Sequence, residues 1–302
     1  MTFERTLTRP VEAAGVGLHS GAPARLRLLP AASGTGVQFR RVDLEGFILE
    51  ANSANIAKVS YATSLMKRGV LISTTEHLLS ALVGAGIDNV IVELDNLELP
   101  ILDGSALPFV QMIEEAGPRR QRRQRMAMRI VAPLELREAG KFIGIYPGDG
   151  YRLRYEINFP HPAIGHQVFE LDLTPDAYRR ELAPARTFGF LADFDAMRRQ
   201  GLIRGGSMDN AVVLDAHRVV NGPLRFPNEF VRHKMLDLIG DLALLGQPLI
   251  GYVRADRAGH ALHTALVKRL LSDRRLWEPV PVEELLPVAA LPAVEFMRPG
   301  AD

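Results

Sequence analysis

Short apolar segments and turns alternate in the first part of the chain. ARLRLLP (24–30) alternates apolar and polar positions, which is the period of a half-buried strand, and NVIVELDN (89–96) is a continuous apolar strand. Between them, STTEHLLSALVGAG (73–86) has the helical period, and ALPFVQMIEEAG (106–117) predicts a second helix. This part of the chain is therefore predicted to combine short strands with two helices.

The second half of the chain opens with strands and ends with helices. KFIGIYPGDGYRLRYEINF (141–159) predicts a hairpin that turns at PGDG. The later segments are predicted in the order helix PDAYRRELA (175–183), short helix FDAMRRQG (194–201), apolar helix NEFVRHKMLDLIGDLALLG (228–246), strand LIGYVRA (249–255) and long helix GHALHTALVKRLLSD (259–273). Because strands and helices mix without regular βαβ alternation, the sequence predicts an α+β fold.

The composition changes in the middle of the chain. GPRRQRRQR (117–125) starts with Gly-Pro and contains five arginines and no apolar residue, which is typical of an exposed linker. The alternative is a nucleic-acid patch, but the run is short, lacks aromatics and lies beside Glu114 and Glu115. The predicted division is therefore an α+β domain at 1–117, a basic linker at 118–126, a second α+β domain at 127–280 and a tail at 281–302.

The composition narrows the class of protein. The 302 residues have room for two domains, and the net charge of +1 indicates neither nucleic acid nor acidic lipid as a partner. The absence of cysteine excludes disulfides, thiolate metal sites and a cysteine nucleophile, so a metal would need His, Asp or Glu ligands. The N-terminus lacks the apolar core of a signal peptide, and no window reaches about 18 consecutive apolar residues. We therefore expect a cytoplasmic protein without a membrane span.

One predicted helix carries an unusual polar stripe. His233, Asp237 and Asp241 follow each other at intervals of four residues in a segment rich in Met, Leu and Ile, so they share one face. His233 and Asp237 could bind one metal, or they could simply pair with each other on a partly exposed face. Asp241 favours a functional site, because three such groups in a buried helix need partners. It could also orient another histidine.

A catalytic zinc usually has three protein ligands, so a further ligand must come from elsewhere. The chain has eight histidines: His19, His77, His161, His166, His217, His233, His260 and His263. His77 is distinctive because Glu76 precedes it at the start of an apolar helix, where the anionic form is favoured and a carboxylate could act as general base. The alternative is that Glu76 only completes a capping box with Ser73. His260 opens the last helix as a candidate general acid or oxyanion partner, and His263, one turn later, is its rival.

Several blocks in the chain resemble one family when taken together and in order. They are GVGLHSG (15–21), TTEHLLSAL (74–82), IDNVIVEL (87–94), LDGSALPFV (102–110), NFPHPAI (158–164), RTFGF (186–190), GGSMDNAVVLD (205–215), NEFVRHKMLDLIGDL (228–242) and AGHAL (258–262). The chain thereby resembles the UDP-3-O-acyl-N-acetylglucosamine deacetylases, the zinc-dependent enzymes of the committed step of lipid A synthesis in Gram-negative bacteria. The resemblance implies hydrolysis of the N-acetyl amide of UDP-3-O-[(3R)-3-hydroxyacyl]-N-acetylglucosamine.

The resemblance also assigns roles to individual residues. It implies His77, His233 and Asp237 as ligands of Zn²⁺, although Fe²⁺ suits the same ligands. It implies Glu76 as general base, His260 as general acid, Asp241 as the partner that orients His260, and Thr187 as stabiliser of the oxyanion. It implies substrate contacts by Lys234 at the sugar or diphosphate, Phe159 near the uridine, and Phe188 and His19 at the sugar site.

The fold implied by the resemblance is two α+β domains of like topology, each a sheet packed with two helices, with the active site between them. An inserted βαβ unit in the second domain would form an apolar passage for the acyl chain. Its residues here are Leu191, Phe194, Ile203, Met208, Ala211 and Val213, which could equally be ordinary core. Two departures are His263, where the family pattern has Asn, and the unmatched tail after about residue 280.

Other functions compete with this hypothesis. A metal hydrolase acting on a different substrate would use the same metal ligands, whereas a nucleic-acid-binding protein would use the arginine run and leave His77 and His233 unexplained. A purely structural zinc site usually has four protein ligands, often cysteines, and this chain has none. We therefore expect a monomer that binds a UDP-3-O-acyl-GlcNAc substrate and no nucleic acid.

Overall fold

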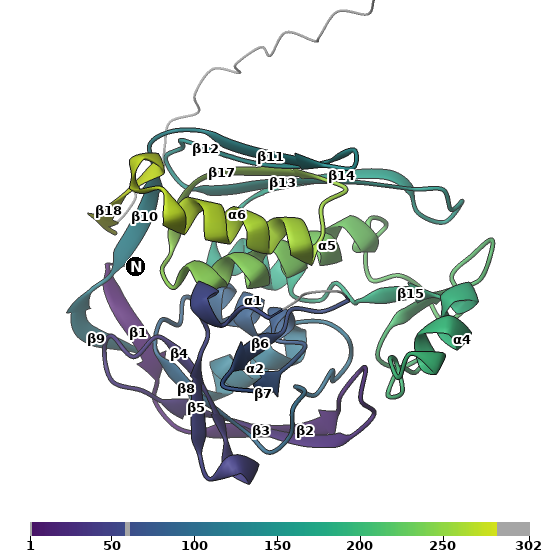
Figure 1. The fold of residues 1–302 in the computed structure, drawn as a ribbon, viewed down its shortest axis with the longest axis horizontal. Coiled ribbons are helices and arrows are strands. Elements are labelled where there is room, and N and C mark those ends of the chain that lie inside the picture. Colours follow the sequence, from purple (N-terminus) through teal and green to yellow (C-terminus); the bar gives the residue numbers. More distant parts are fainter. Residues whose placement is uncertain (1, 58–60, 283–302) are drawn as a thin grey trace, which may run out of the picture.

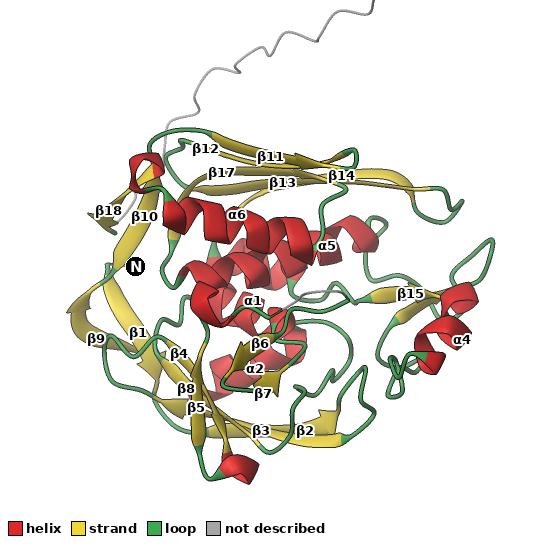
Figure 2. Ribbon diagram, viewed as in Figure 1, coloured by secondary structure: helices red, strands yellow, loops and turns green. Residues whose placement is uncertain are grey.

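The structure, a computed structural model, describes residues 2–57 and 61–282. Two β-sheets form the outer layers of the molecule, and the long helices lie between them (Figure 1). Figure 2 shows the same arrangement, with the helices enclosed by strands above and below. The predicted α+β class is confirmed. Within the described residues, no helix is long and apolar enough to cross a membrane.

The first sheet is built from the N-terminal part of the chain. Its strands lie in the order β2 (Val11–Val16), β3 (Pro23–Pro30), β8 (Val90–Leu94), β4 (Val37–Arg41) and β5 (Phe47–Glu50). Alternate residues of β3, such as Leu26 and Leu28, are buried because they face the helices, while the residues between them are exposed. The helices α1 (Glu76–Ala85) and α2 (Leu107–Ala116) pack on this sheet. The predicted strands and helices of this part are confirmed.

The second sheet comes from the C-terminal part of the chain. Its main path is β11 (Leu134–Glu138), β12 (Lys141–Tyr146), β17 (Leu249–Asp256), β10 (Met126–Ile130) and β18 (Trp277–Pro281); β13 (Tyr151–Phe159) pairs with β17 and with β14 (Gly165–Asp172). The helices α5 (Glu229–Leu242) and α6 (His260–Ser272) cover its inner face. The predicted helices 228–246 and 259–273 and the strand 249–255 are confirmed.

The predicted hairpin at 141–159 is wrong in its pairing. Both strands form, but β12 and β13 do not pair with each other. Instead, β17 lies between them, antiparallel to β12 and parallel to β13. The reason is burial: β17 is an apolar strand that satisfies its backbone groups and side chains best in the middle of the sheet.

The segment predicted as a linker is a strand rather than an open connection. β9 (Pro118–Gln124) pairs antiparallel with β1 (Phe3–Leu7), and the Arg120 guanidinium lies 3.7 Å from the centre of the Phe3 ring. Most of its side chains are exposed, which explains its charge. The domain limits at 117 and 127 stay predictions. Of the tail predicted at 281–302, only Pro281 and Val282 lie inside the described residues, and Pro281 ends β18.

A βαβ unit projects from the side of the molecule (Figure 1). β15 (Phe188–Phe190) and β16 (Val212–Leu214) pair in parallel, and α4 (Leu191–Arg199) follows β15. The remaining elements are short: the hairpin β6 (Leu65–Lys67) and β7 (Val70–Ile72), α3 (Pro175–Ala177) with the π-turn Tyr178–Leu182, and the 3-10 turns Val42–Leu44, Ser53–Asn55, Ala243–Leu245 and Arg274–Leu276. The helices predicted at 175–183 and 194–201 correspond to α3 with its π-turn and to α4.

Candidate active site

Three candidate metal ligands meet where α1 crosses α5. His77 is the second residue of α1, and His233 and Asp237 lie one turn apart on α5. Asp237 Oδ1 lies 3.4 Å from Nε2 of His233 and 3.7 Å from Nε2 of His77. All three side chains are buried, and one possible ligand atom from each lies within 4.8 Å of the others.

The chemistry of these three side chains fits a divalent metal ion. Nδ1 of His233 donates to the Ala185 carbonyl at 3.0 Å, which leaves the Nε2 lone pair directed at Asp237 and not involved in a hydrogen bond. Burial and the neighbouring His233 lower the pKa of His77 to about 3, so its imidazole is neutral at pH 7. Burial raises the pKa of Asp237, but His233 and Lys234 lower it more strongly, which keeps the carboxylate ionised. Two neutral imidazoles and one carboxylate form a suitable ligand set.

Glu76 lies beside this cluster at the start of α1. The predicted capping box is wrong: Ser73 Oγ is 2.9 Å from Ser64 Oγ, and Thr74 has a positive φ of 58°, so the helix begins only after it. Glu76 Oε2 instead accepts a hydrogen bond from the Thr63 backbone N–H at 3.0 Å. Burial raises the pKa of Glu76 to about 8, and a cation held by the adjacent ligands would lower it. The carboxyl group is thus placed to exchange a proton.

His260 and Asp241 form a buried hydrogen-bonded pair on the other side of the cluster. Nδ1 of His260 lies 2.7 Å from Oδ2 of Asp241. Burial lowers the pKa of His260, but the charge and hydrogen bond of Asp241 raise it more strongly, to about 9. Nε2 of His260 lies 4.0 Å from both Glu76 Oε1 and Asp237 Oδ2. A protonated imidazole and a carboxyl group therefore face each other next to the candidate ligands.

These groups open into a cavity of about 340 Å³. Twelve of the residues predicted for the site line it: His19, Glu76, His77, Thr187, Phe188, Phe194, Ile203, Ala211, His233, Lys234, Asp237 and His260. The structure holds the Thr187 segment in place through two backbone bonds, from Thr187 N to Gly104 O at 2.8 Å and from Val212 N to Thr187 O at 2.7 Å. Lys234 Nζ lies 2.8 Å from Asp237 Oδ2, at the ligand cluster.

Five predicted site residues do not line the cavity. Asp241 is fully buried behind His260, and Val213 is buried in β16. Phe159 packs its ring 5.7 Å from that of Phe188, which itself lines the cavity. Leu191 and Met208 are exposed at 40% and 51%, on the outside of the βαβ unit.

The chain is similar over most of its length to one family of known proteins. A model of the LpxC family, UDP-3-O-acyl N-acetylglycosamine deacetylase, matches residues 4–272. The chain belongs to this family. A relative from Solibacter usitatus (strain Ellin6076) is 54% identical over 286 residues, 94% of this chain and 97% of its own length. One from Xylella fastidiosa (strain Temecula1 / ATCC 700964) is 43% identical over 304 residues, 99% of both chains. Both are named UDP-3-O-acyl-N-acetylglucosamine deacetylase.

Some site residues of this deacetylase-family chain were not found from the sequence. Phe190 and Met197 also line the cavity, and Met197 could have been found because it lies three residues after Phe194 on α4. Thr63 donates to Oδ1 of Asp241 and carried no sequence signal, because it lies 178 residues away. Tyr61 likewise comes from a loop without regular structure.

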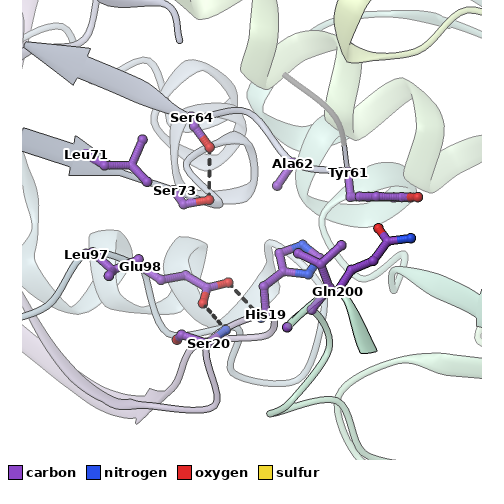
Figure 3. A pocket seen from close by; sticks show the side chains of 12 residues that line it. His19, Ser20, Tyr61, Ala62, Ser64, Leu71, Ser73, Leu97, Glu98 and Gln200 are labelled. Carbon is purple, nitrogen blue, oxygen red and sulfur yellow. Dashed lines mark hydrogen bonds between the residues drawn. The ribbon is translucent and has the colours of Figure 1, made fainter. Parts of the chain in front are cut away.

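A second cavity of about 420 Å³ shares His19 and Tyr61 with the first (Figure 3). Glu98 lies on its wall, where it accepts hydrogen bonds from the backbone N–H groups of His19 at 2.9 Å and Ser20 at 2.7 Å. Among residues 2–57 and 61–282, neither nitrogen of the His19 ring has a hydrogen-bond partner, and both are shielded from solvent. Glu98 therefore holds the loop that places His19 between the two cavities.

Proposed function

We propose that the chain hydrolyses the N-acetyl amide of UDP-3-O-[(3R)-3-hydroxyacyl]-N-acetylglucosamine, giving acetate and the free 2-amine in the committed step of lipid A biosynthesis. One observation carries the proposal. The three candidate ligands His77, His233 and Asp237 lie beside two groups that can transfer protons. These are the carboxyl group of Glu76 and the protonated imidazole of His260, whose Oε1 and Nε2 atoms are 4.0 Å apart. Amide hydrolysis needs this combination: a base for water, and an acid for the leaving amine. The names of the relatives support the substrate.

The proposed metal ligands are His77, His233 and Asp237. We assign Zn²⁺ because two imidazoles and one carboxylate are a common ligand set of catalytic zinc, and Fe²⁺ is the alternative ion for the same ligands. When bound, the ion supplies Lewis-acid chemistry, lowering the pKa of water and polarising the amide carbonyl.

The residues around the ligands divide the proton transfers between them. Glu76 accepts the proton of the attacking water as its oxygen bonds to the acetyl carbon. Thr187, on the cavity wall, stabilises the negative charge that develops on the carbonyl oxygen. Nε2 of His260 donates a proton to the sugar nitrogen as the C–N bond breaks, and Asp241 holds Nδ1 and stabilises the cationic ring. Acetate and a neutral amine result.

The cavity wall divides into polar and apolar parts that suit a lipid-linked nucleotide sugar. We assign the sugar and diphosphate to Lys234, His19 and Phe188, and the uridine to Phe159. The acyl chain would follow the βαβ unit; the residues assigned to its passage are Leu191, Phe194, Ile203, Met208, Ala211 and Val213. We further propose that the protein acts in the cytoplasm as a monomer.

Substrate comparison tests the proposed function. The purified protein is given equal concentrations of UDP-3-O-acyl-GlcNAc, UDP-GlcNAc without the acyl chain, and a simple N-acetyl amide, and released acetate is measured. The proposal predicts turnover of the acylated substrate and a kcat/KM at least about 100-fold lower for the other two, because remote binding energy is used in the transition state. Equal turnover of all three would indicate a general amidase.

The passage is tested by a pair of variants. Ala211→Leu adds bulk to the cavity wall and should raise KM for a long acyl chain while leaving a short one unaffected. Met66→Ala removes an exposed side chain of β6 that lines neither cavity, and it is the control. If both variants leave the preference for acyl length unchanged, the acyl chain does not pass Ala211.

A further inference from the structure

Asp241 binds two imidazoles at the same oxygen. Its Oδ2 lies 2.7 Å from Nδ1 of His260 and 2.8 Å from Nδ1 of His263, and its Oδ1 accepts the hydroxyl of Thr63. Asp241 and His263 are both fully buried. A carboxylate only accepts hydrogen bonds, so both imidazoles present an Nδ1–H to it.

His263 is itself held on its other side. Its Nε2 lies 3.1 Å from Oη of Tyr155, and the two rings meet edge to face with centres 5.9 Å apart. The single proton of this Tyr155 hydroxyl faces two acceptors, Nε2 of His263 and, at 2.6 Å, the carbonyl of Ala258, two residues before His260. His263 thus joins the carboxylate to the turn from which His260 emerges, and it does not line the cavity.

This arrangement controls the orientation of His260. Thr63 and His260 each hold one oxygen of the carboxylate, and the donor of His263, which reaches Oδ2 from a second direction, further restricts rotation about its terminal torsion. A fixed Asp241 keeps the proton of His260 on Nδ1 and directs Nε2 at the cavity. A buried carboxylate that loses a hydrogen-bond donor also loses much of the stabilisation of its charged form. The ionised Asp241 is therefore sensitive to the loss of the His263 hydrogen bond.

We propose that His263 is a positioning residue for the reaction: by its hydrogen bond to Asp241 it fixes the plane of that carboxylate and, through it, the orientation and tautomer of His260. The inference rests on the proposed function, in which His260 donates the proton to the leaving amine. His263 acts only through Asp241, since it touches neither the cavity nor the candidate metal ligands. Its loss should therefore lower kcat and leave KM and metal content alone.

Two nearly isosteric variants separate hydrogen bonding from packing. In His263→Asn the amide nitrogen stands the same number of bonds from the backbone as Nδ1 and can still donate to Asp241, whereas His263→Leu has similar shape and no donor. The inference predicts that the Leu variant loses at least about tenfold in kcat with KM within about twofold, and that the Asn variant stays within about threefold of wild type. Metal content should be equal in all three.

Equal kcat values in the Asn and Leu variants would overturn the inference. If the Leu variant does not fold, His263→Gln replaces it, because its amide lies near the Nε2 position and leaves Asp241 without this donor. A Gln variant as active as the Asn variant would overturn the inference equally. Nitrogen NMR of labelled histidines gives a second measurement. At a pH above the pKa of His260, the proton of the neutral ring should stay on Nδ1 in the Asn variant and redistribute in the Leu or Gln variant. Because this measurement needs no substrate, its result is independent of whether the wild type deacetylates the proposed substrate.

Discussion

Gly240 of α5 lies against the backbone of Glu76 at the start of α1. A β-carbon on Gly240 would overlap the Glu76 carbonyl oxygen and crowd its carbonyl carbon and α-carbon. At Gly240 the backbones of the two helices therefore touch, with no side chain between them. This close approach brings the candidate base and the ligand His77 on α1 next to Asp237 on α5.

Gly240→Ala should test the role of this contact. The added methyl group meets backbone rather than a movable side chain, so the helices must separate, at a cost of about 1–3 kcal/mol in the free energy of unfolding. The separation should also lower kcat. The matched control is Gly150→Ala, because a β-carbon at Gly150 has no atom within 4 Å. Equal denaturation midpoints for the two variants would contradict the account.

Glu76→Gln keeps the shape of the side chain and removes the proton acceptor. We expect kcat to fall by about 10²–10⁴, which is the usual contribution of a general base, with the bound metal retained. Steady-state kinetics and metal analysis of the same preparation check this. Activity within a few fold of wild type would show that another group accepts the proton.

Asp241→Asn should change the pH dependence of the reaction. In the wild type, Asp241 raises the pKa of His260, to about 9 despite its burial. The protonated imidazole is the proposed acid, so activity that depends on it should be present below this pKa and lost above it. Removing the carboxylate charge lowers the pKa, and the alkaline limb of kcat/KM should move to lower pH. The control is Asp172→Asn, which removes a carboxylate exposed at 79% on β14. A profile of Asp241→Asn that coincides with those of the control and the wild type would contradict this prediction.

Glu229 holds the segment in which Arg186 precedes Thr187 of the cavity wall. It is fully buried and accepts hydrogen bonds from Arg186 Nε at 2.8 Å and from the backbone N–H groups of Arg186 at 3.0 Å and Arg225 at 2.6 Å. Burial raises its pKa, but the hydrogen bonds from Arg186 lower it more strongly. Its stabilising contribution is therefore present above the unfolded pKa of about 4.3 and is lost as pH falls through the lower folded pKa.

Glu229→Gln is expected to cost about 3 kcal/mol in the free energy of unfolding at pH 7, because it leaves the Arg186 charge without its partner. The difference from wild type should shrink below about pH 4. Glu114→Gln removes a comparable but exposed pair with Arg179 and should lower the free energy of unfolding much less, because solvent screens exposed charges. Denaturant titrations at pH 7 and below about pH 4 measure the free energy of unfolding of each variant. Equal losses for the two variants at pH 7 would show that the Arg186 segment does not depend on Glu229.

Local patterns predicted the helices and many strands of this fold, because periodicity reports which face an element buries. Which strands pair with each other in a sheet was not predictable from periodicity. The PGDG turn at 147–150 marked the end of one strand and the start of the next, but β17, about a hundred residues later, separates them. The arginine-rich pattern of 118–124 did not indicate a strand, because β9 pairs with β1 through its backbone while most of its side chains stay in solvent.

Spacing along α5 predicted which polar side chains share a face, and the resemblance to known deacetylases supplied the partners from other elements. Neither the spacing nor the resemblance predicted the hydrogen bonds between distant segments. Thr63 reaches Asp241 from 178 residues away, and Tyr155 reaches His263 across 108 residues. His263 was noticed as a rival to His260, whereas the structure places it behind Asp241.

The most direct test of the account measures metal content and acetate release together, in wild type and in His233→Ala. We expect one tightly bound zinc or iron ion per chain in the wild type and turnover of UDP-3-O-acyl-GlcNAc, both lost in the variant, because His233 Nε2 is one of the three proposed ligand atoms. A wild-type protein that binds no metal, and that added zinc or iron(II) does not activate, would contradict it.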